Sequence, residues 1–462
     1  MFDSLHEECG VFGIYDPNGH CAESAYYGLV SLQHRGQEGC GIAVNRDREI
    51  YYYKDVGLVN EVFDEEKLSN LEGTMAVGHV RYSTAGGSLR ENVQPLVLRY
   101  VKGTLAIVHN GNITNTDELK KDLVVNGAIF QTTADTEVIA YYIARERAKA
   151  GSIEEAVANV MGKIKGAFSL IVMSPNKLVV ARDPWGFRPL CMGKKENAVV
   201  FASESCAFDS IEAEFVRDIE PGEILTVKQG ENGKIESNRK FCGGKSHLCI
   251  FEHIYFARPD SVIDGELVHE TRKKAGVFLA KQSPVDADIV VGVPDSGLSA
   301  AAGYSEYTGL PNAMGFIKNR YIGRTFIKPK QSERANAVKM KLNVLKDVVA
   351  GKKVVMVDDS IVRGTTSGRI VNMLREAGAK EVHVRISSPP FAWPCFFGTD
   401  IPSRDALIAN HHTIEETAKL INADTLDYLS MENLHKIAPN SKCTFCDACF
   451  TGNYAVDVKH LL

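Results

Sequence analysis

A segment near residue 360 combines acids, glycines and hydroxyls in a pattern suited to binding phosphate. It reads VVMVDDSIVRGTTSG: the four apolar residues predict a buried strand, and Asp358 and Asp359 follow at its carboxyl end, where open α/β sheets bind ligands. The residues that follow can wrap N–H and hydroxyl donors around an anion at a helix N-terminus; they are Arg363, Gly364, Thr365, Thr366, Ser367 and Gly368. Paired carboxylates beside such a loop predict a site for a sugar phosphate, whose hydroxyls or bound Mg2+ need oxygen ligands. The alternative is a plain turn and helix cap.

A second cluster consists of cysteines. Cys443, Cys446 and Cys449 lie in CTFCDAC, which contains the two-residue spacing that commonly grips a metal. Further thiolates must come from elsewhere, and the candidates in the second half are Cys242, Cys249 and Cys395. The chain has 11 cysteines, too few for a disulfide scaffold, so clustered thiols indicate a metal site. Four thiolates around zinc are the generic interpretation, and spacing does not exclude it.

The elements that must position these residues fall into two patterns. Up to about residue 226, short apolar runs predict strands, interrupted by helical patterns at 135–150 and 153–164. A polar stretch at 227–246 is the candidate linker. Beyond it strands alternate with helices, which predicts a parallel, doubly wound sheet, and the final sixty residues look mostly helical. We therefore expect two α/β domains, the first built on antiparallel strands.

Composition excludes several classes of protein. The chain has 462 residues, 44% hydrophobic and 24% charged, as in globular proteins of about two to three domains. Its 53 basic and 58 acidic side chains give a formal charge of −5, which provides no electrostatic case for nucleic acid. No run approaches 18 apolar residues, and the N-terminal residues are acidic where a secretory signal is basic. We expect a cytoplasmic protein that binds neither membrane nor nucleic acid.

The acidic segment resembles the PRPP-binding motif of type I phosphoribosyltransferases. In that family the two acids contact the ribose hydroxyls, and in the amidotransferase branch they also ligate Mg2+; by resemblance these are Asp358 and Asp359. The segment GVPDSG is similar to the family's second loop, which makes Ser296 a further Mg2+ ligand. The stretch 318–329 resembles the loop that closes over PRPP, with cations suited to a leaving pyrophosphate: Lys318, Arg320, Arg324 and Lys328. Taken alone, it is equally compatible with a solvated basic turn.

The first half resembles class II glutamine amidotransferases, which are N-terminal-nucleophile hydrolases with an αββα sandwich. The resemblance implies that residues 1–8 are removed and that the α-amine of Cys9, which titrates close to neutral pH, is the base for its own thiol. Without its family context, Cys9 would be interpreted as an inert strand cysteine. We interpret His79 and His109 as hydrogen-bonded sheet histidines, because the amine already supplies a base, and Cys40 as a core residue.

Three further segments carry the same resemblance, GHVRYSTAG, HNGNITN and TADTE. In this family the Asn110 side chain and the Gly111 N–H would hold the oxyanion that forms when the thiolate attacks glutamine. Arg81 would pair with the α-carboxylate of glutamine and Asp135 with its α-ammonium. These roles are implied by the resemblance.

The segments around the cysteines resemble the iron–sulfur type of the glutamine PRPP amidotransferase family. They are CIFEHIYFARPDS, SPPFAWPCFFGTD and CDACFTG. The resemblance implies a 4Fe–4S cluster held by Cys249, Cys395, Cys446 and Cys449, and it leaves Cys443 and Cys242 spare.

The resemblance covers nearly the whole chain and implies one reaction. Glutamine, PRPP and water would give 5-phosphoribosylamine, glutamate and pyrophosphate, the first committed step of purine biosynthesis. Ammonia released at Cys9 would pass to the PRPP site through a shielded passage, since ammonia in bulk water is mostly protonated. Feedback inhibition by purine nucleotides and a homotetramer are also implied. The expected domains are a propeptide at 1–8, a class II glutamine amidotransferase domain at 9–235, and a phosphoribosyltransferase domain with C-terminal helices at 250–462.

Two other functions compete with this one. A glucosamine-phosphate synthase would share the first half but should carry sugar isomerase domains in place of the acidic segment. A non-enzymatic regulator that senses PRPP would bind through the same acidic loop but would not need the residues around Cys9. Retention of residues 1–8, or absence of glutaminase activity, would favour the regulator.

Overall fold

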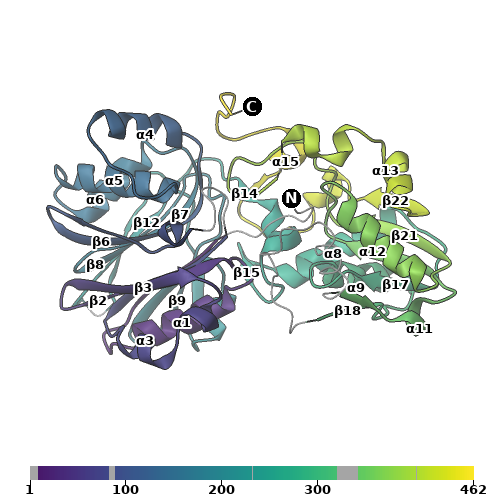
Figure 1. Ribbon diagram of the computed structural model, residues 1–462, viewed down its shortest axis with the longest axis horizontal. Coiled ribbons are helices and arrows are strands. Elements are labelled where there is room, and N and C mark those ends of the chain that lie inside the picture. The colour runs from purple at the N-terminus through teal and green to yellow at the C-terminus, as the bar shows by residue number, and fades with distance from the viewer. Residues whose placement is uncertain (1–8, 83–88, 232, 320–341, 402, 462) are drawn as a thin grey trace.

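Two antiparallel sheets lie face to face in the first half of the computed structural model (Figure 1). The structure describes residues 9–82, 89–231, 233–319, 342–401 and 403–461. The first sheet has the order β11 (Glu214–Asp218), β9 (Cys191–Lys195), β10 (Ala198–Ala202), β1 (Gly10–Tyr15), β4 (Met75–Arg81), β2 (Gly39–Arg46), β3 (Glu49–Val56). The second has the order β13 (Ile235–Asn238), β12 (Ile224–Lys228), β8 (Lys177–Arg182), β7 (Gly166–Met173), β6 (Gly103–Ile113), β5 (Leu96–Tyr100).

Helices cover the outer face of each sheet, because the central strands, such as β4 and β7, bury side chains on both faces. Against the first sheet pack α1 (Cys21–Ser31), α2 (Val59–Val62), α3 (Glu65–Ser69) and α7 (Cys206–Asp209). Against the second pack α4 (Thr116–Val125), α5 (Asp135–Arg147) and α6 (Ile153–Met161). A third apolar cluster fills the space between the sheets. The first half is therefore an αββα sandwich, as predicted.

Two of the larger helices were not predicted. The helical patterns at 135–150 and 153–164 correspond to α5 and α6, but α1 and α4 interrupt the strands as well. In α1, Gly28 weakens the helical pattern, and it is required because a Cβ there would lie 2.3 Å from the ring of Phe12. The polar stretch at 227–246 is not wholly a linker, because β13 pairs with β12 and runs to Asn238.

The second half contains a parallel sheet with helices on both faces, as the alternating pattern predicts. Its order is β17 (Ile289–Gly292), β20 (Lys353–Asp358), β21 (Glu381–Ile386), β22 (Thr425–Tyr428). On one face pack α8 (Val268–Gln282) and α9 (Gly297–Thr308); on the other pack α11 (Lys346–Val349), α12 (Thr365–Glu376) and α13 (Ile414–Leu420). The short strands β18 (Phe316–Lys318) and β19 (Leu342–Val344) pair with each other, as do β15 (Val262–Ile263) and β16 (Glu266–Leu267).

The prediction that the final sixty residues are mostly helical was wrong. Thr425–Tyr428 is the edge strand β22, and the remaining helices are short: α14 (Met431–Leu434) and α15 (Ala448–Thr451). β23 (Phe445–Cys446) pairs in parallel with β14 (Leu248–Cys249), which joins the end of the chain to the start of the second half. In the part of the chain that the structure describes, no helix is long and apolar enough to cross a bilayer.

Candidate functional site

One end of the sandwich gathers the predicted glutaminase residues. The residues of β1, β4 and β6 that fill the space between the sheets are Val11, Tyr15, Met75, Val77, Ala106 and Val108. Side chains alternate along a strand, so Cys9, Arg81 and Asn110 point into the same space. β1 and β4 are paired through Gly10 and Val80, which places Cys9 beside the end of β4. Sheet register therefore places Cys9 near Arg81, and Asn110 faces the same space from the second sheet.

Cys9 is held at both its thiol and its backbone. The half-buried thiol donates a hydrogen bond to the carbonyl oxygen of Tyr82, at 3.4 Å. Its own carbonyl oxygen accepts a hydrogen bond from Nε of the buried Arg35, at 3.1 Å. Residues 1–8, the predicted propeptide, lie outside the described residues.

Asn110 and Gly111 have the features expected of an oxyanion site. Asn110 is 1% exposed, and its Nδ2 has no hydrogen-bond partner among the residues that the structure describes. Such a buried donor costs free energy unless a ligand satisfies it. Gly111 adopts a φ of 139°, and a Cβ there would lie 2.1 Å from the carbonyl oxygen of Ala167. Only glycine fits this position.

Arg81 and Asp135, the predicted glutamine anchors, lie at the ends of their elements. Arg81 ends β4, and its Nη1 is 3.8 Å from Oε2 of Glu38. Asp135 begins α5, and its Oδ2 accepts a hydrogen bond from the N–H of Ile113. Burial opposes ionisation of Asp135, but the nearby His109 and the backbone N–H groups outweigh it, so its pKa lies below the usual range.

The two histidines lie within the sandwich. Nε2 of His79 is 3.2 Å from the carbonyl oxygen of His109, and Nδ1 of His109 is 3.4 Å from Oδ1 of Asp135. Nδ1 of His79 has no partner among the described residues, so this histidine is only partly satisfied. Cys40 is fully buried in the outer core of the first sheet, as predicted.

Arg35, which holds the Cys9 backbone, belongs to a buried ion cluster that the sequence analysis did not predict. The Arg35 guanidinium pairs with Glu204 at 2.6 Å and with Glu252 at 2.8 Å, and all three side chains are inaccessible to solvent. Nη1 of Arg188 lies 3.6 Å from Oε1 of Glu252. Arg35 and Arg188 lie in two segments that match the family, SLQHRGQEGCGIA and RDPWGFRPL, but no pattern pairs them with Glu252. The Glu252 carboxylate therefore joins the second half of the chain to the residue that holds Cys9.

The acidic pair lies where the sequence analysis expects it, at the carboxyl end of β20. Oδ2 of Asp359 accepts a hydrogen bond from Oγ of Ser296 at 2.5 Å, so three predicted Mg2+ ligands converge. Burial raises the pKa of both carboxyl groups, and Asp359 raises that of Asp358 further. Two desolvated carboxylates beside a hydroxyl are a donor set that suits a hard divalent cation.

The predicted phosphate loop leads into α12. Gly364 has a φ of 83° immediately before the helix, so Thr365, Thr366 and Ser367 form its first turn with their N–H groups at the N-terminus. Lys318 lies at the end of β18, and its Nζ is 2.5 Å from Oδ2 of Asp295, in the loop that carries Ser296. Arg320, Arg324 and Lys328 lie outside the described residues.

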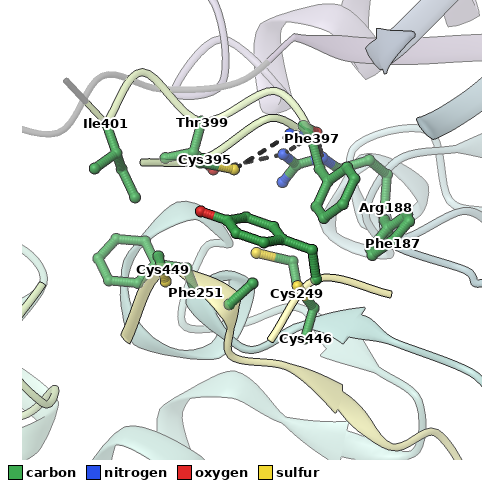
Figure 2. Close-up of a pocket in the computed structure, with 12 residues that line it drawn as sticks. Phe187, Arg188, Cys249, Phe251, Cys395, Phe397, Thr399, Ile401, Cys446 and Cys449 are labelled. Carbon is green, nitrogen blue, oxygen red and sulfur yellow. Dashed lines mark hydrogen bonds between the residues drawn. The ribbon is translucent and has the colours of Figure 1, made fainter. Parts of the chain in front are cut away.

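Figure 2 shows that the four predicted cluster cysteines line one cavity. Cys249 and Cys446 are register partners on β14 and β23, Cys449 is on α15, and Cys395 comes from the loop after β21. The rest of the lining is largely apolar: Phe187, Arg188, Phe251, Phe397, Thr399, Ile401, Ala448 and Tyr454. Cys443 and Cys242, the spare cysteines, are not part of this lining.

The cavity strongly desolvates its thiols. Burial raises the pKa of Cys446 to about 12 and that of Cys449 well above its usual range. Among the described residues, no three His, Cys, Asp or Glu side chains converge as they would around a single metal ion. The four thiols line the same cavity from β14, β23, α15 and the loop after β21.

Comparison with known proteins agrees with this arrangement. A model of the glutamine amidotransferase domain matches residues 79–210, and one of the phosphoribosyl transferase domain matches residues 270–387. The amidophosphoribosyltransferase of Methanocaldococcus jannaschii is 49% identical over 98% of this chain and 98% of its own length. The chain belongs to the amidophosphoribosyltransferase family. The member from Bacillus subtilis is 50% identical over 98% of this chain and 95% of its own length.

Solved structures of amidophosphoribosyltransferases share the whole architecture. The Bacillus subtilis glutamine PRPP amidotransferase complexed with ADP and GMP superposes with a TM-score of 0.90 at 49% identity, covering 97% of this chain and 98% of that chain. The two-domain prediction is confirmed. The second half is a phosphoribosyltransferase domain, so the alternative with sugar isomerase domains was wrong.

Proposed function

We propose that this protein converts glutamine, PRPP and water into 5-phosphoribosylamine, glutamate and pyrophosphate, the first committed step of purine biosynthesis. The observation that carries the proposal is the buried amide of Asn110, which has no partner among the described residues and faces the space that Cys9 enters. The second half adds an acidic pair and a predicted phosphate loop. Full-length relatives at 49% and 50% identity support the same activity.

At the first site, the chain's own groups supply each chemical role. Removal of residues 1–8 would free the α-amine of Cys9, which takes the thiol proton as the sulfur attacks the glutamine carboxamide. Asn110 Nδ2 and the Gly111 N–H would stabilise the oxyanion. Arg81 would pair with the α-carboxylate of glutamine, and Asp135 would pair with its α-ammonium group.

At the second site, the phosphate loop would hold the ribose phosphate, and Asp358 and Asp359 would hold the ribose hydroxyls. Mg2+, which Asp358, Asp359 and Ser296 would ligate, would neutralise the charge of the leaving pyrophosphate. Lys318 lies beside the loop that carries Ser296 and would add a cation, together with Arg320 and Arg324. Ammonia from Cys9 would attack C1 of the ribose without entering bulk water.

The cysteine cavity suits a 4Fe–4S cluster held by Cys249, Cys395, Cys446 and Cys449. The four thiols line one largely apolar cavity, and as thiolates they would supply the four cysteine ligands that a 4Fe–4S cluster needs. Iron and sulfide analysis of anaerobically purified protein tests it. Zinc in place of iron would overturn it.

Regulation and assembly extend the proposal. The solved relative binds ADP and GMP, which supports feedback inhibition of this chain by purine nucleotides. A homotetramer, implied by the family resemblance, is tested by light scattering of the purified protein.

The decisive experiment measures pyrophosphate release from PRPP and Mg2+ by anaerobically purified protein, with glutamine and then ammonium as nitrogen source. We expect release with both, and Cys9→Ala should lose the glutamine reaction while it keeps the ammonium reaction. Release with neither, despite PRPP binding, would replace the enzyme with the PRPP-sensing regulator.

A further inference from the structure

A loop of the second half lies across the end of the strand that carries the oxyanion residues. Nδ2 of Asn112, two residues beyond Asn110 on β6, donates a hydrogen bond to the carbonyl oxygen of Phe396 at 2.9 Å. Asn112 points to the same side of the strand as Asn110, because side chains alternate. The two partners are 284 residues apart, so this contact joins the two halves of the molecule directly at the first site.

The same loop also touches Gly111. Gly398 has a φ of 117°, and a Cβ there would lie 3.4 Å from the carbonyl carbon of Gly111 and 2.9 Å from Nη2 of Arg188. The neighbouring Phe397 carbonyl oxygen accepts hydrogen bonds from Nε and Nη2 of Arg188, at 3.1 and 2.5 Å. The backbone of 396–398 is thus fixed on one side by a buried guanidinium and on the other side packs against Gly111 and Asn112.

The C-terminal tail fixes the loop and the strand at two further points. The Tyr454 hydroxyl donates a hydrogen bond to the carbonyl oxygen of Pro394, at 2.7 Å. Nε2 of His460 lies 3.1 Å from the carbonyl oxygen of Thr114, one residue after β6 ends. Val456 and Val458 pack in one apolar cluster with Phe187 and Phe397.

We propose that the segment 396–398, held through Asn112, positions the Asn110 amide and the Gly111 N–H for catalysis. Asn112 and Gly398 are then positioning residues of the glutaminase reaction, although Gly398 belongs to the other half of the chain. An oxyanion hole works only when its donors lie within hydrogen-bond distance of the oxyanion, and small displacements cost rate. The inference rests on the proposed glutaminase function and holds whether or not the cysteines carry metal.

The test compares Asn112→Ala with Asn115→Ala. Asn115 also donates through Nδ2 to a backbone carbonyl oxygen, that of Lys163 at 3.0 Å, but within the first half. For Asn112→Ala we expect the kcat of glutamine hydrolysis to fall by about 10-fold to 30-fold, since loss of a whole oxyanion donor costs roughly 100-fold to 1,000-fold. Its KM for glutamine, its ammonium-dependent pyrophosphate release and its iron content should match those of Asn115→Ala.

Two readouts distinguish positioning from general damage. Iodoacetamide alkylates a thiol without forming an oxyanion, so its rate at Cys9 should be equal in both variants, whereas amide hydrogen exchange over 106–114 should be faster in Asn112→Ala. Asn112→Asp keeps the shape but places a carboxylate against the Phe396 carbonyl, so it should lose kcat as well. Equal kcat in Asn112→Ala, Asn112→Asp and Asn115→Ala would overturn the inference, as would a parallel loss of alkylation. Absence of glutaminase activity in the unaltered chain would overturn the proposed function instead.

Discussion

Asn110 is a buried amide that the fold itself leaves without a partner in the described part of the chain. Replacement by alanine should therefore cost little stability and much activity. We expect Asn110→Ala to lower the kcat for glutamine by about 100-fold to 1,000-fold, with the ammonium-dependent rate unchanged. Steady-state assays with each nitrogen source measure this. Asn45→Ala is the control, because Asn45 is also a fully buried strand asparagine but lies outside the site; an equal loss of glutamine kcat there would contradict the assignment.

His79 makes the stability of the protein depend on pH. Burial lowers its pKa from 6.5 to about 3, so between these values the unfolded chain binds a proton that the folded chain does not. The neutral, buried His79 therefore leaves the free energy of unfolding at its full value above pH 6.5. That free energy falls as the pH drops from 6.5 toward 3. Going from pH 7 to pH 5 should cost about 2 kcal/mol through this residue. Urea unfolding of His79→Gln should show a correspondingly smaller loss; an unchanged pH dependence would count against a neutral buried His79.

At the scale of elements, residue type and periodicity could predict the strands that carry the site. Short β-branched runs located β1, β4, β6 and β20, whereas the association of Cys9, Arg81 and Asn110 came from the family resemblance. Elements whose signal depends on distant partners could not be predicted. The sequence of β22 is typical of a helix, but pairing with β21 makes it a strand. The ion pairs of Glu252 depend on packing between the two halves, which no local pattern encodes.

The turn before α12 is an element that glycine makes possible. Gly364 has a φ of 83°, where any side chain is strained by about 1–2 kcal/mol, and a Cβ would meet Ile408 at 2.8 Å. Gly364→Ala should shift the N–H groups that we propose bind the phosphate. The KM for PRPP should then rise about tenfold, which corresponds to the loss of roughly one hydrogen bond.

Gly351 provides the matched control for that substitution. It has a φ of 72°, but a Cβ there meets nothing within 4 Å. Gly351→Ala should cost similar backbone strain, measured by thermal unfolding, and leave the KM for PRPP unchanged. A tenfold higher KM in both variants would show that the effect of Gly364 is not local.

At the scale of the whole molecule, Glu252 is the charge that binds the two halves. Its carboxylate lies within ion-pair distance of both Arg35 and Arg188 with no access to solvent, so replacing it by alanine removes a buried negative charge from beside two buried guanidinium groups. We expect Glu252→Ala to lower the free energy of unfolding by about 3–5 kcal/mol. Calorimetry should also show the halves unfolding separately. Glu223→Ala removes a buried carboxylate paired within one domain, with Arg217, and should keep a single transition; two transitions there as well would contradict the role of Glu252.

The contacts of Asn112 with Phe396 and of Thr114 with His460 have a consequence for biosynthesis. They span 284 and 346 residues, so the sandwich emerges from the ribosome long before its partners are made. β6 lacks its contacts with Phe396 and His460 until residue 460 has been translated. If these contacts position the oxyanion donors as proposed, we expect an incomplete chain to hydrolyse glutamine below the full rate before it can use the ammonia.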